Sequence, residues 1–353
     1  MIDSIRLLDI ALLVIIIGAL AALGVIFGHA ARAAWRERRS RAALERGRIA
    51  LASVGVNGRM DRADVALLKA LPRRLQVRLF VELMPSMAGS QRQRLAALAH
   101  EIGLAGAAEQ MCYSRKWWMR LRGVRLLTAV GGGDDVVPPL FRDRHPAVRA
   151  EAAEWAGQHP DPVIVEQLIA LLETPEAVGS WVLRDSLLRI GPACIPALAA
   201  YLETHSGAQA EPALEVAAGL ADPRFSAAAE RLCGDPGPGV RARAAALAGA
   251  IGGDALVRRL EGLLRDPDAA VRAAAAASLG RLGHWPAAAE LAGMLRDPAW
   301  IVRSQSALAM RRLGSPGHLL LRRALDDRDR FAADIARQVL DMPETTAERD
   351  QWR

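Results

Sequence analysis

The stretch LRDPDAAVRAAAAASLGRL, residues 264–282, contains a pattern that occurs several times in this chain. It begins with an Asp-Pro pair, continues with a Val-Arg pair and ends with small residues before Leu-Gly. The pattern returns 31 residues later and 31 residues earlier, and a further copy begins at residue 143. In each copy an arginine follows the aspartate by six positions, which gives the pairs Asp143/Arg149, Asp235/Arg241, Asp266/Arg272 and Asp297/Arg303. A fixed period of this length predicts a stacked array of similar units.

Each unit is expected to contain two short helices. In residues 268–282 the positions Val271, Ala275 and Leu279 recur at helical spacing and define one apolar face. Asp266-Pro267 precedes this run, so we expect the Asp266 carboxylate to accept the free N–H groups of the first turn. A second, shorter helix is expected over residues 286–295. Because neither helix can bury its apolar face alone, the sequence predicts an all-α fold, an α-solenoid of stacked helix pairs.

The repeats are expected to fill residues 114–342, in about eight units that start near 114, 143, 174, 205, 235, 266, 297 and 327. In the first unit Ser114 replaces the aspartate, while Arg120 keeps the arginine position. By the same period, the arginine position holds Ser180, Glu211 and Ala333 in the units that begin at 174, 205 and 327. The two units at 174 and 205 lack the Asp/Arg pair, and we expect the stack to bend or to bind a partner there.

The unit D-P-x-x-x-V-R-x-x-A-x-x-x-L-G resembles the short HEAT repeat of the phycobilisome-lyase-like type, most closely over residues 235–325. This resemblance implies that the aspartates and arginines of the four pairs bond along the stack as a ladder, with a structural role. The chain as a whole resembles bacterial membrane-anchored HEAT-repeat proteins. Some of those proteins occur beside membrane glycosyltransferases and envelope polysaccharide machinery, which implies a scaffold for a protein partner.

Residues 10–31 contain no Asp, Glu, Lys or Arg, and we interpret them as a transmembrane helix behind a short extracytoplasmic tail at 1–9. A helix of this length extends roughly 33 Å, enough for a hydrocarbon core of about 30 Å. The alternative is a cleaved signal peptide ending near Arg32, but the apolar run exceeds the usual length of about 7–15 residues. Gly24 and Gly28 form a GxxxG pair, so a homodimer through this helix is a further hypothesis.

Seven arginines follow the span within residues 32–48, whereas Arg6 alone precedes it. The positive-inside rule therefore places the body in the cytoplasm and the single-pass anchor in a bacterial inner (cytoplasmic) membrane. We expect 32–48 to form a basic juxtamembrane helix that contacts anionic lipid headgroups, at about 1 kcal/mol per basic residue near the surface. The alternative interpretation is that the arginines of residues 32–48 serve only as a signal for membrane topology. The expected membrane-surface residues are Arg32, Trp35, Arg36, Arg38, Arg39 and Arg41.

The formal net charge of +7 is unevenly distributed along the chain. Residues 1–48 carry +4 and residues 49–130 carry +8, whereas residues 131–353 carry −5. Residues 49–113 lack the Asp/Arg pattern and are expected to form a helical N-terminal cap on the first repeat, and 343–353 reads as a polar tail. A nucleic-acid-binding solenoid needs a basic stripe along several repeats, so the acidic balance of the repeats makes nucleic acid an unlikely ligand.

The sequence contains no pattern typical of catalysis. Its seven histidines show no i,i+3 or i,i+4 pairing that would place two metal ligands on one helical face. The run Gly131–Asp135 is glycine-rich, but it lacks the Lys-Ser/Thr of a phosphate-binding loop and reads as a turn between helices. Cys112, Cys194 and Cys233 are widely spaced and read as buried core residues of a reducing compartment. We therefore expect no enzymatic activity, no cofactor and no metal.

The segment SRKWWMRLRGVR, residues 114–125, is the strongest candidate for a partner-binding site. Trp117 and Trp118 are adjacent, about 100° apart on a helix, so one is expected to face the core and the other a side or solvent. Trp and Arg dominate the residues that contribute most to protein–protein binding. The expected partner-binding residues are Trp117, Trp118, Arg120 and Arg122. The competing interpretation is that both tryptophans pack against the N-terminal cap.

The function predicted from these features is that of a membrane-anchored cytoplasmic scaffold or adaptor that binds a protein partner. A bilin lyase-like function is the alternative that the repeat type suggests, but a membrane anchor is not expected for it.

Overall fold

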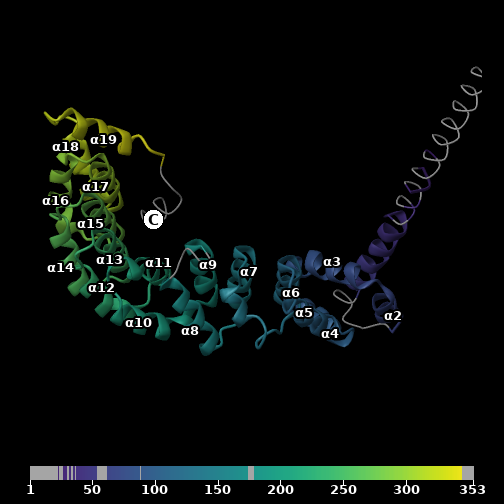
Figure 1. The fold of residues 1–353 in the computed structure, drawn as a ribbon. Coiled ribbons are helices and arrows are strands. Elements are labelled where there is room, and N and C mark those ends of the chain that lie inside the picture. Colours follow the sequence, from purple (N-terminus) through teal and green to yellow (C-terminus); the bar gives the residue numbers. More distant parts are fainter. Residues whose placement is uncertain are drawn as a thin grey trace, which may run out of the picture. The chain divides into compact units, whose positions relative to one another are not determined.

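The computed structural model describes residues 37–53, 62–87, 89–173 and 179–343, together with 23, 27–29, 32 and 35. The chain divides into two compact units, residues 1–133 and residues 134–353, which we call unit 1 and unit 2. Every regular element among the described residues is a helix, so the all-α prediction is confirmed there (Figure 1).

Unit 1 begins with a helix over residues 37–53. It continues with α2 (Arg62–Ala70), α3 (Arg73–Leu83), the 3₁₀ turn η1 (Met84–Ser86), α4 (Gly89–Glu101), α5 (Leu104–Cys112) and α6 (Trp117–Val130). The buried Gln76 side chain ties α3 to α2, because its amide donates to the Leu68 carbonyl at 2.7 Å.

The helix over residues 37–53 is more than a basic surface segment. Leu44, Ala50 and Leu51 are buried, and they recur at the spacing of one helical face. Arg48 connects this helix to α3 by donating a hydrogen bond to Glu82 at 2.8 Å. The boundary predicted at residue 48 is therefore wrong for this helix, because its apolar face continues into the core of unit 1.

Helix α6 packs against α3, α4 and α5, all of them in unit 1. The α5–α6 contact is close because Gly123 has no side chain: a Cβ there would lie 2.7 Å from the Ala108 carbonyl oxygen. The helix assigned to the first repeat by its sequence pattern is thus part of the compact N-terminal unit.

Unit 2 contains the remaining helix pairs. The first helices are α7 (Pro146–Ala156), α9 (Ser180–Ile190), α11 (Ala210–Leu220), α13 (Pro238–Ile251), α15 (Ala269–Arg281), α17 (Trp300–Arg312) and α19 (Arg330–Leu340). The second helices are α8 (Pro162–Ala170), α10 (Ile195–Thr204), α12 (Ser226–Leu232), α14 (Asp254–Leu263), α16 (Ala288–Gly293) and α18 (Ser315–Ala324). In Figure 1 the helices α9 to α19 with odd numbers form one layer on the inside of a curve, and the second helices form the outer layer.

Small residues bring neighbouring first helices close together. A Cβ on Gly280 of α15 would lie 2.4 Å from the Cα of Ala309 on α17, so only glycine fits this contact. The buried Ser278 hydroxyl crosses to α13, where it donates to the Ala245 carbonyl at 2.9 Å. The alanine-rich run that first defines the repeat is therefore the contact surface between successive units.

The start of the first helix differs from the prediction. In the repeat at 266 the helix is capped by Asp268, whose carboxylate accepts from the N–H groups of Ala270 and Val271. Asp266 lies two residues earlier and accepts instead from the Asp268 N–H at 2.9 Å. The predicted second helix at 286–295 is broken into α16 and two flanking 3₁₀ turns, η8 (Trp285–Ala287) and η9 (Met294–Arg296).

The irregular units keep the helix ends of the repeat but not its arginine. In regular units a glycine with positive φ lies eleven residues after the arginine, as Gly283 does after Arg272. In the unit at 174, Gly191 lies eleven residues after Ser180, which supports the predicted register there. In the unit at 205, α11 ends at Ala221, whose φ is 50°, so the equivalent position is Ala210 and the predicted position, Glu211, is one residue too late.

The predicted transmembrane helix, residues 10–31, lies outside the described residues except at 23 and 27–29. Gly24 of the GxxxG pair is also outside them, as are residues 344–353 of the predicted tail. None of the helices described by the structure is long and apolar enough to cross a membrane.

Candidate functional site

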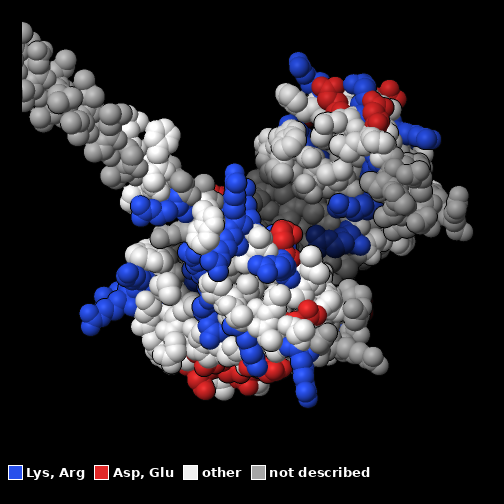
Figure 2. Space-filling model, turned by 90° about the vertical axis from the view of Figure 1, so that its right-hand side faces the viewer, with Lys and Arg blue, Asp and Glu red and all other residues white. Residues whose placement is uncertain are grey.

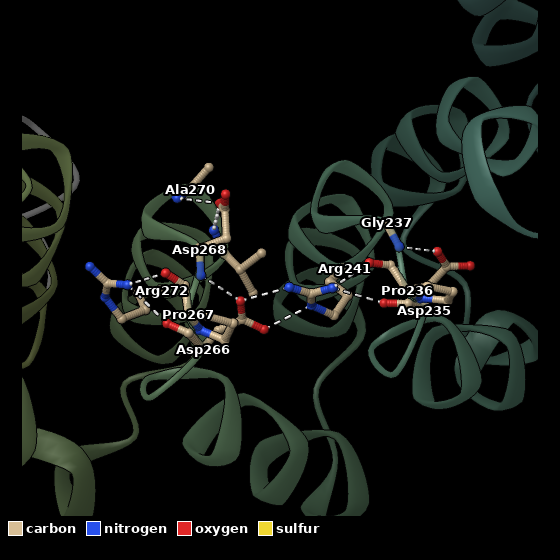
Figure 3. A network of polar contacts seen from close by, with 10 residues as sticks. Asp235, Pro236, Gly237, Arg241, Asp266, Pro267, Asp268, Ala270 and Arg272 are labelled. Atoms are coloured by element: carbon tan, nitrogen blue, oxygen red, sulfur yellow. Dashed lines mark hydrogen bonds and ion pairs between the residues drawn. The ribbon is translucent and has the colours of Figure 1, made fainter.

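The Asp/Arg pairs form rungs between successive repeats of unit 2 (Figure 3). Arg241 donates from Nε and Nη2 to the two carboxylate oxygens of Asp266, both at 2.8 Å. Arg272 binds Asp297 of the following repeat in the same way, at 2.8 and 2.9 Å. Each arginine also donates from Nη1 to its own turn, as Arg272 does to the Asp266 carbonyl at 2.9 Å. One guanidinium thus fastens its own turn and the next one.

The arginines of two other predicted pairs make the same contact with their own turns. Arg149 and Arg303 donate to the carbonyl oxygens of Asp143 and Asp297 in their own turns. Arg303 lies over the ring of Phe331, 5.1 Å from its centroid, and Asp327 is bound by Arg296 instead. Asp235 accepts from the Gly207 N–H at 3.0 Å, so this aspartate fastens the irregular unit to the first regular one.

Burial and hydrogen bonding act in opposite directions on the rung aspartates. Burial raises the pKa of Asp266 and of Asp297, but the hydrogen bonds from Arg241 and Arg272, with the backbone N–H and nearby charges, lower it by more. The pKa of each carboxyl is therefore below its ordinary value, and the rungs stay ionised near neutral pH. Their groups are fully engaged with one another, so they are suited to holding turns rather than to reacting with a substrate.

Trp117 and Trp118 begin α6 and both lie on the surface. They are 38% and 52% exposed, so the expectation that one of them faces the core is wrong. Their rings meet edge to face with centroids 6.1 Å apart, and the Lys116 ammonium lies 5.6 Å from the Trp118 ring centroid. Tyr113, which is 69% exposed, adds a third aromatic ring in the same segment.

The aromatic residues are surrounded by cations. Arg115, Arg122 and Arg125 are exposed, and the described ion pairs involve neither Arg115 nor Arg122. Figure 2 shows many Lys and Arg side chains on the described surface of unit 1 that faces the viewer. We call residues 113–125 with these exposed side chains the aromatic–basic surface.

Arg120 differs from the other predicted partner-binding residues. It is half-buried, and its Nη1 donates to the Ser114 carbonyl at 2.9 Å and to the Arg115 carbonyl at 3.2 Å. Arg272 makes the same two contacts in its own turn, with Asp266 and Pro267. Arg120 therefore has the same role as the repeat arginines with which it aligns, because it holds the turn that precedes the two tryptophans.

Sequence reasoning missed a second exposed aromatic group, at the C-terminal end of unit 2. Trp300 and Ile301 are the first two residues of α17 and are 59% and 40% exposed; Phe331, the second residue of α19, is 55% exposed. In the repeat at 266 these two positions hold Ala269 and Ala270. A large apolar residue at either of the first two positions of a first helix is the signal that finds both this group and Trp117/Trp118. Trp181 and Trp285 are exposed too.

The predicted membrane-surface residues lie on the first helix of unit 1 and on the residues before it. Arg32, Trp35, Arg38, Arg39 and Arg41 are exposed at helical positions. Arg36 lies outside the described residues. The Arg39 guanidinium lies over the Trp35 ring at 5.2 Å from its centroid, and Arg41 is paired with Glu37.

The three cysteines are buried thiols. Burial raises the pKa of Cys112, Cys194 and Cys233 to about 11, so these thiols stay protonated at neutral pH. Within the described residues there is no group of three or more His, Cys, Asp or Glu side chains placed to hold a metal ion. A cavity of about 950 Å³ in unit 2 is lined by Asp134, His159 and Asp161, and His159 is stacked on Trp155.

The helix pairs and the rungs define an α-solenoid. A family model described as HEAT repeats matches residues 256–341. No curated protein matches the sequence.

Among solved structures, an engineered protein is 17% identical and covers 86% of this chain and 95% of its own length, with a TM-score of 0.39. Escherichia coli YibA is 16% identical and covers 69% of this chain and 97% of its own, with a TM-score of 0.41. The CpcE–CpcF complex of phycocyanin lyase from Nostoc sp. is 19% identical and covers 67% and 93%, with a TM-score of 0.33. At these values the likenesses carry no conclusion about function.

Proposed function

We propose that this protein is a membrane-anchored scaffold whose HEAT-type body binds a protein partner through the aromatic–basic surface of unit 1. The exposure of Trp117 and Trp118 beside the exposed cations Arg115 and Arg122 carries the proposal. Two adjacent aromatic rings at 38% and 52% exposure leave apolar area in water that a partner would cover. Aromatic and arginine side chains are also the residues that most often dominate the free energy of binding.

The anchor of this scaffold is residues 10–31, and its body faces the cytoplasm of a bacterium. Support comes from the uncharged run itself and from the seven arginines that follow it. The resemblance to membrane-anchored HEAT-repeat proteins suggests a membrane glycosyltransferase or envelope polysaccharide machinery as the partner. A membrane partner suits a binding surface that follows closely after the anchor in the chain.

The scaffold acts without catalysis of its own. Its most regular polar groups are engaged in rungs, and its three thiols have a pKa raised by burial. A turnover assay on purified full-length protein, with nucleotide, sugar and nucleic-acid substrates, tests this. Reproducible turnover that a point substitution abolishes would contradict it.

Affinity purification from membranes tests the binding surface. The variant Trp117→Ala/Trp118→Ala should lose its partner, because truncating such residues often costs about 2 kcal/mol or more of binding free energy each. Trp285→Ala is the matched control, since Trp285 is an exposed tryptophan of unit 2. A folded double variant that retains every wild-type partner at wild-type strength would show that the surface is elsewhere.

Reporter fusions at Arg353 test the orientation. A cytoplasmic body predicts a fluorescent protein fusion that is bright and a periplasmic phosphatase fusion that is inactive. The opposite pair of results would place the body outside the cytoplasm.

A further inference from the structure

A cavity of about 660 Å³ lies within unit 1, between the helix over residues 37–53 and the helices α2 and α3. Its apolar lining comes from Leu67, Leu71 and Leu75, together with small side chains of the same three helices. Its polar lining is cationic: Arg39 and Arg46 come from the first helix and Arg74 from α3. Trp35 completes the lining, and it is 60% exposed. Among the described residues, the only other polar side chain that lines the cavity is that of Ser40, and no acidic side chain lines it.

The three cavity arginines differ from their neighbours in how they are neutralised. Arg41, Arg48 and Arg78 are paired with glutamates, Arg48 and Arg78 both with Glu82. The described ion pairs include none that involves Arg39, Arg46 or Arg74, although all three are exposed. Glu37, Glu45 and Glu82 therefore neutralise arginines that do not line the cavity, and three positive charges remain at its rim.

A ligand that satisfies this lining needs an anionic group and an apolar part in one molecule. Arginine is suited to phosphate oxygens because its guanidinium presents several N–H donors in a planar fork. The leucines and the Trp35 ring offer apolar surface to a hydrocarbon chain, and tryptophan is common at the level of lipid headgroups. A free phosphate would satisfy the arginines but would leave the apolar lining in water.

We propose that this cavity binds the phosphate headgroup of an anionic phospholipid, with the first part of its acyl chain against Leu67, Leu71 and Leu75. The source of the lipid is the membrane of the proposed anchor, so this inference rests on the proposed function for the location of its ligand. This proposal is more specific than attraction of the whole basic helix to a charged membrane surface. It assigns lipid binding to Arg39, Arg46 and Arg74 and not to the arginines that are paired with glutamates.

The test is native mass spectrometry of the full-length chain in detergent with added phosphatidylglycerol. Arg39→Gln/Arg46→Gln/Arg74→Gln should weaken lipid retention on the order of 100-fold, if each arginine contributes as surface cations do. The matched control is Arg38→Gln/Arg41→Gln/Arg78→Gln, which removes the same charge from the same two helices and should retain the lipid. Equal losses in the two variants would mean diffuse attraction and would overturn the proposal.

A second variant keeps the charges and fills the cavity. Ala70 lines it and is exposed, so Ala70→Trp should abolish retention without changing the net charge or the fold as followed by circular dichroism. Undiminished retention in this folded variant would show that the cavity is not the site.

A competition arm identifies the source of the phosphate. Glycerol 3-phosphate at millimolar concentration should leave phosphatidylglycerol bound, and displacement by it would assign the cavity to a soluble phosphate ester instead. The partner capture that depends on Trp117 and Trp118 should be unchanged in the Arg39/Arg46/Arg74 variant. A variant that loses lipid binding but still captures the partner, or one that loses the partner but still binds lipid, therefore separates the two proposals.

Discussion

The regular repeats at 235–312 and the irregular repeats at 180–232 hold their first helices together by different contacts. Between regular repeats, bidentate rungs such as Arg272–Asp297 have side chains only 15% and 10% exposed. Between α11 and α13, Arg243 pairs with Glu211 and Glu215, and these side chains are 30–39% exposed. The irregular units lack the arginine, and the equivalent positions are Ser180 and Ala210. Stacking therefore requires the apolar contact, and the rung adds a directional contact at one edge.

The largest effect is expected where the close contact between first helices is disturbed, and it tests whether packing contributes more to stability than the rungs do. Gly280→Ala should lower the free energy of unfolding by about 3 kcal/mol, because its Cβ would meet the backbone of Ala309 and the helices must separate. The control Gly262→Ala lies in α14 with open space around it and should stabilise by about 0.5–1 kcal/mol. Chemical denaturation followed by circular dichroism measures both. Equal responses would mean that the α15–α17 contact is not close.

Removing a rung should cost less than removing the close contact. Arg272→Ala should lower the free energy of unfolding by about 2 kcal/mol, because it leaves the mostly buried Asp297 carboxylate without its guanidinium. The partner lost is Asp297 of the next repeat, whereas the Asp266 side chain keeps its contact with Arg241. Arg243→Ala, in the half-exposed network, should cost only about 0–1 kcal/mol. Similar losses in the two variants would remove the distinction between the regular and irregular repeats.

Acid should weaken the regular repeats through the same rungs. The folded-state pKa of Asp266 and Asp297 is lowered, so their contribution to stability is present above the unfolded value of about 3.9. It is lost as the pH falls through the lower folded-state pKa. The difference in unfolding free energy between wild type and Arg272→Ala should therefore be constant from pH 7 to about pH 5 and shrink below about pH 4. Denaturation curves at pH 7, 4 and 3 measure it, and a difference that grows in acid would contradict the assignment.

The smallest effect on stability is expected at the aromatic–basic surface. Trp118→Ala should change the free energy of unfolding by no more than about 0.5 kcal/mol, because the side chain is 52% exposed. Arg120→Ala is the comparison variant, because Arg120 holds the turn by donating to the Ser114 carbonyl. Its loss should lower the melting temperature more than Trp118→Ala does. If Trp118→Ala destabilised unit 1 more than Arg120→Ala, the ring would be structural.

The sequence predicted the helix-pair architecture of the regular repeats because their period is constant and local. The Asp-Pro, Val-Arg and Leu-Gly elements of a repeat all lie within that repeat, so they predict its two helices without information about the neighbouring repeats. The sequence did not show that Arg272 reaches Asp297 rather than Asp266, since that contact joins two turns whose spacing depends on the stack. It also placed the arginine position of α11 one residue too late, at Glu211 rather than Ala210.

The candidate site was predicted in composition but not in geometry. A pair of tryptophans among arginines identifies residues 113–125, and both rings are exposed. Helical spacing alone placed one ring in the core, because it ignores that both residues lie in the first turn, at the edge of the packed face. The cavity at Arg39, Arg46 and Arg74 could not be read from charge runs, since it depends on which arginines the glutamates of unit 1 neutralise.

Photocrosslinking in living cells tests most directly whether the regular repeats support the fold while the aromatic–basic surface binds the partner. A photoreactive amino acid replaces Trp118 in one strain and Ala270 in another, because both are exposed second residues of a first helix. The account predicts a discrete protein adduct from position 118 and none from position 270. An adduct from position 270 with none from position 118 would contradict it.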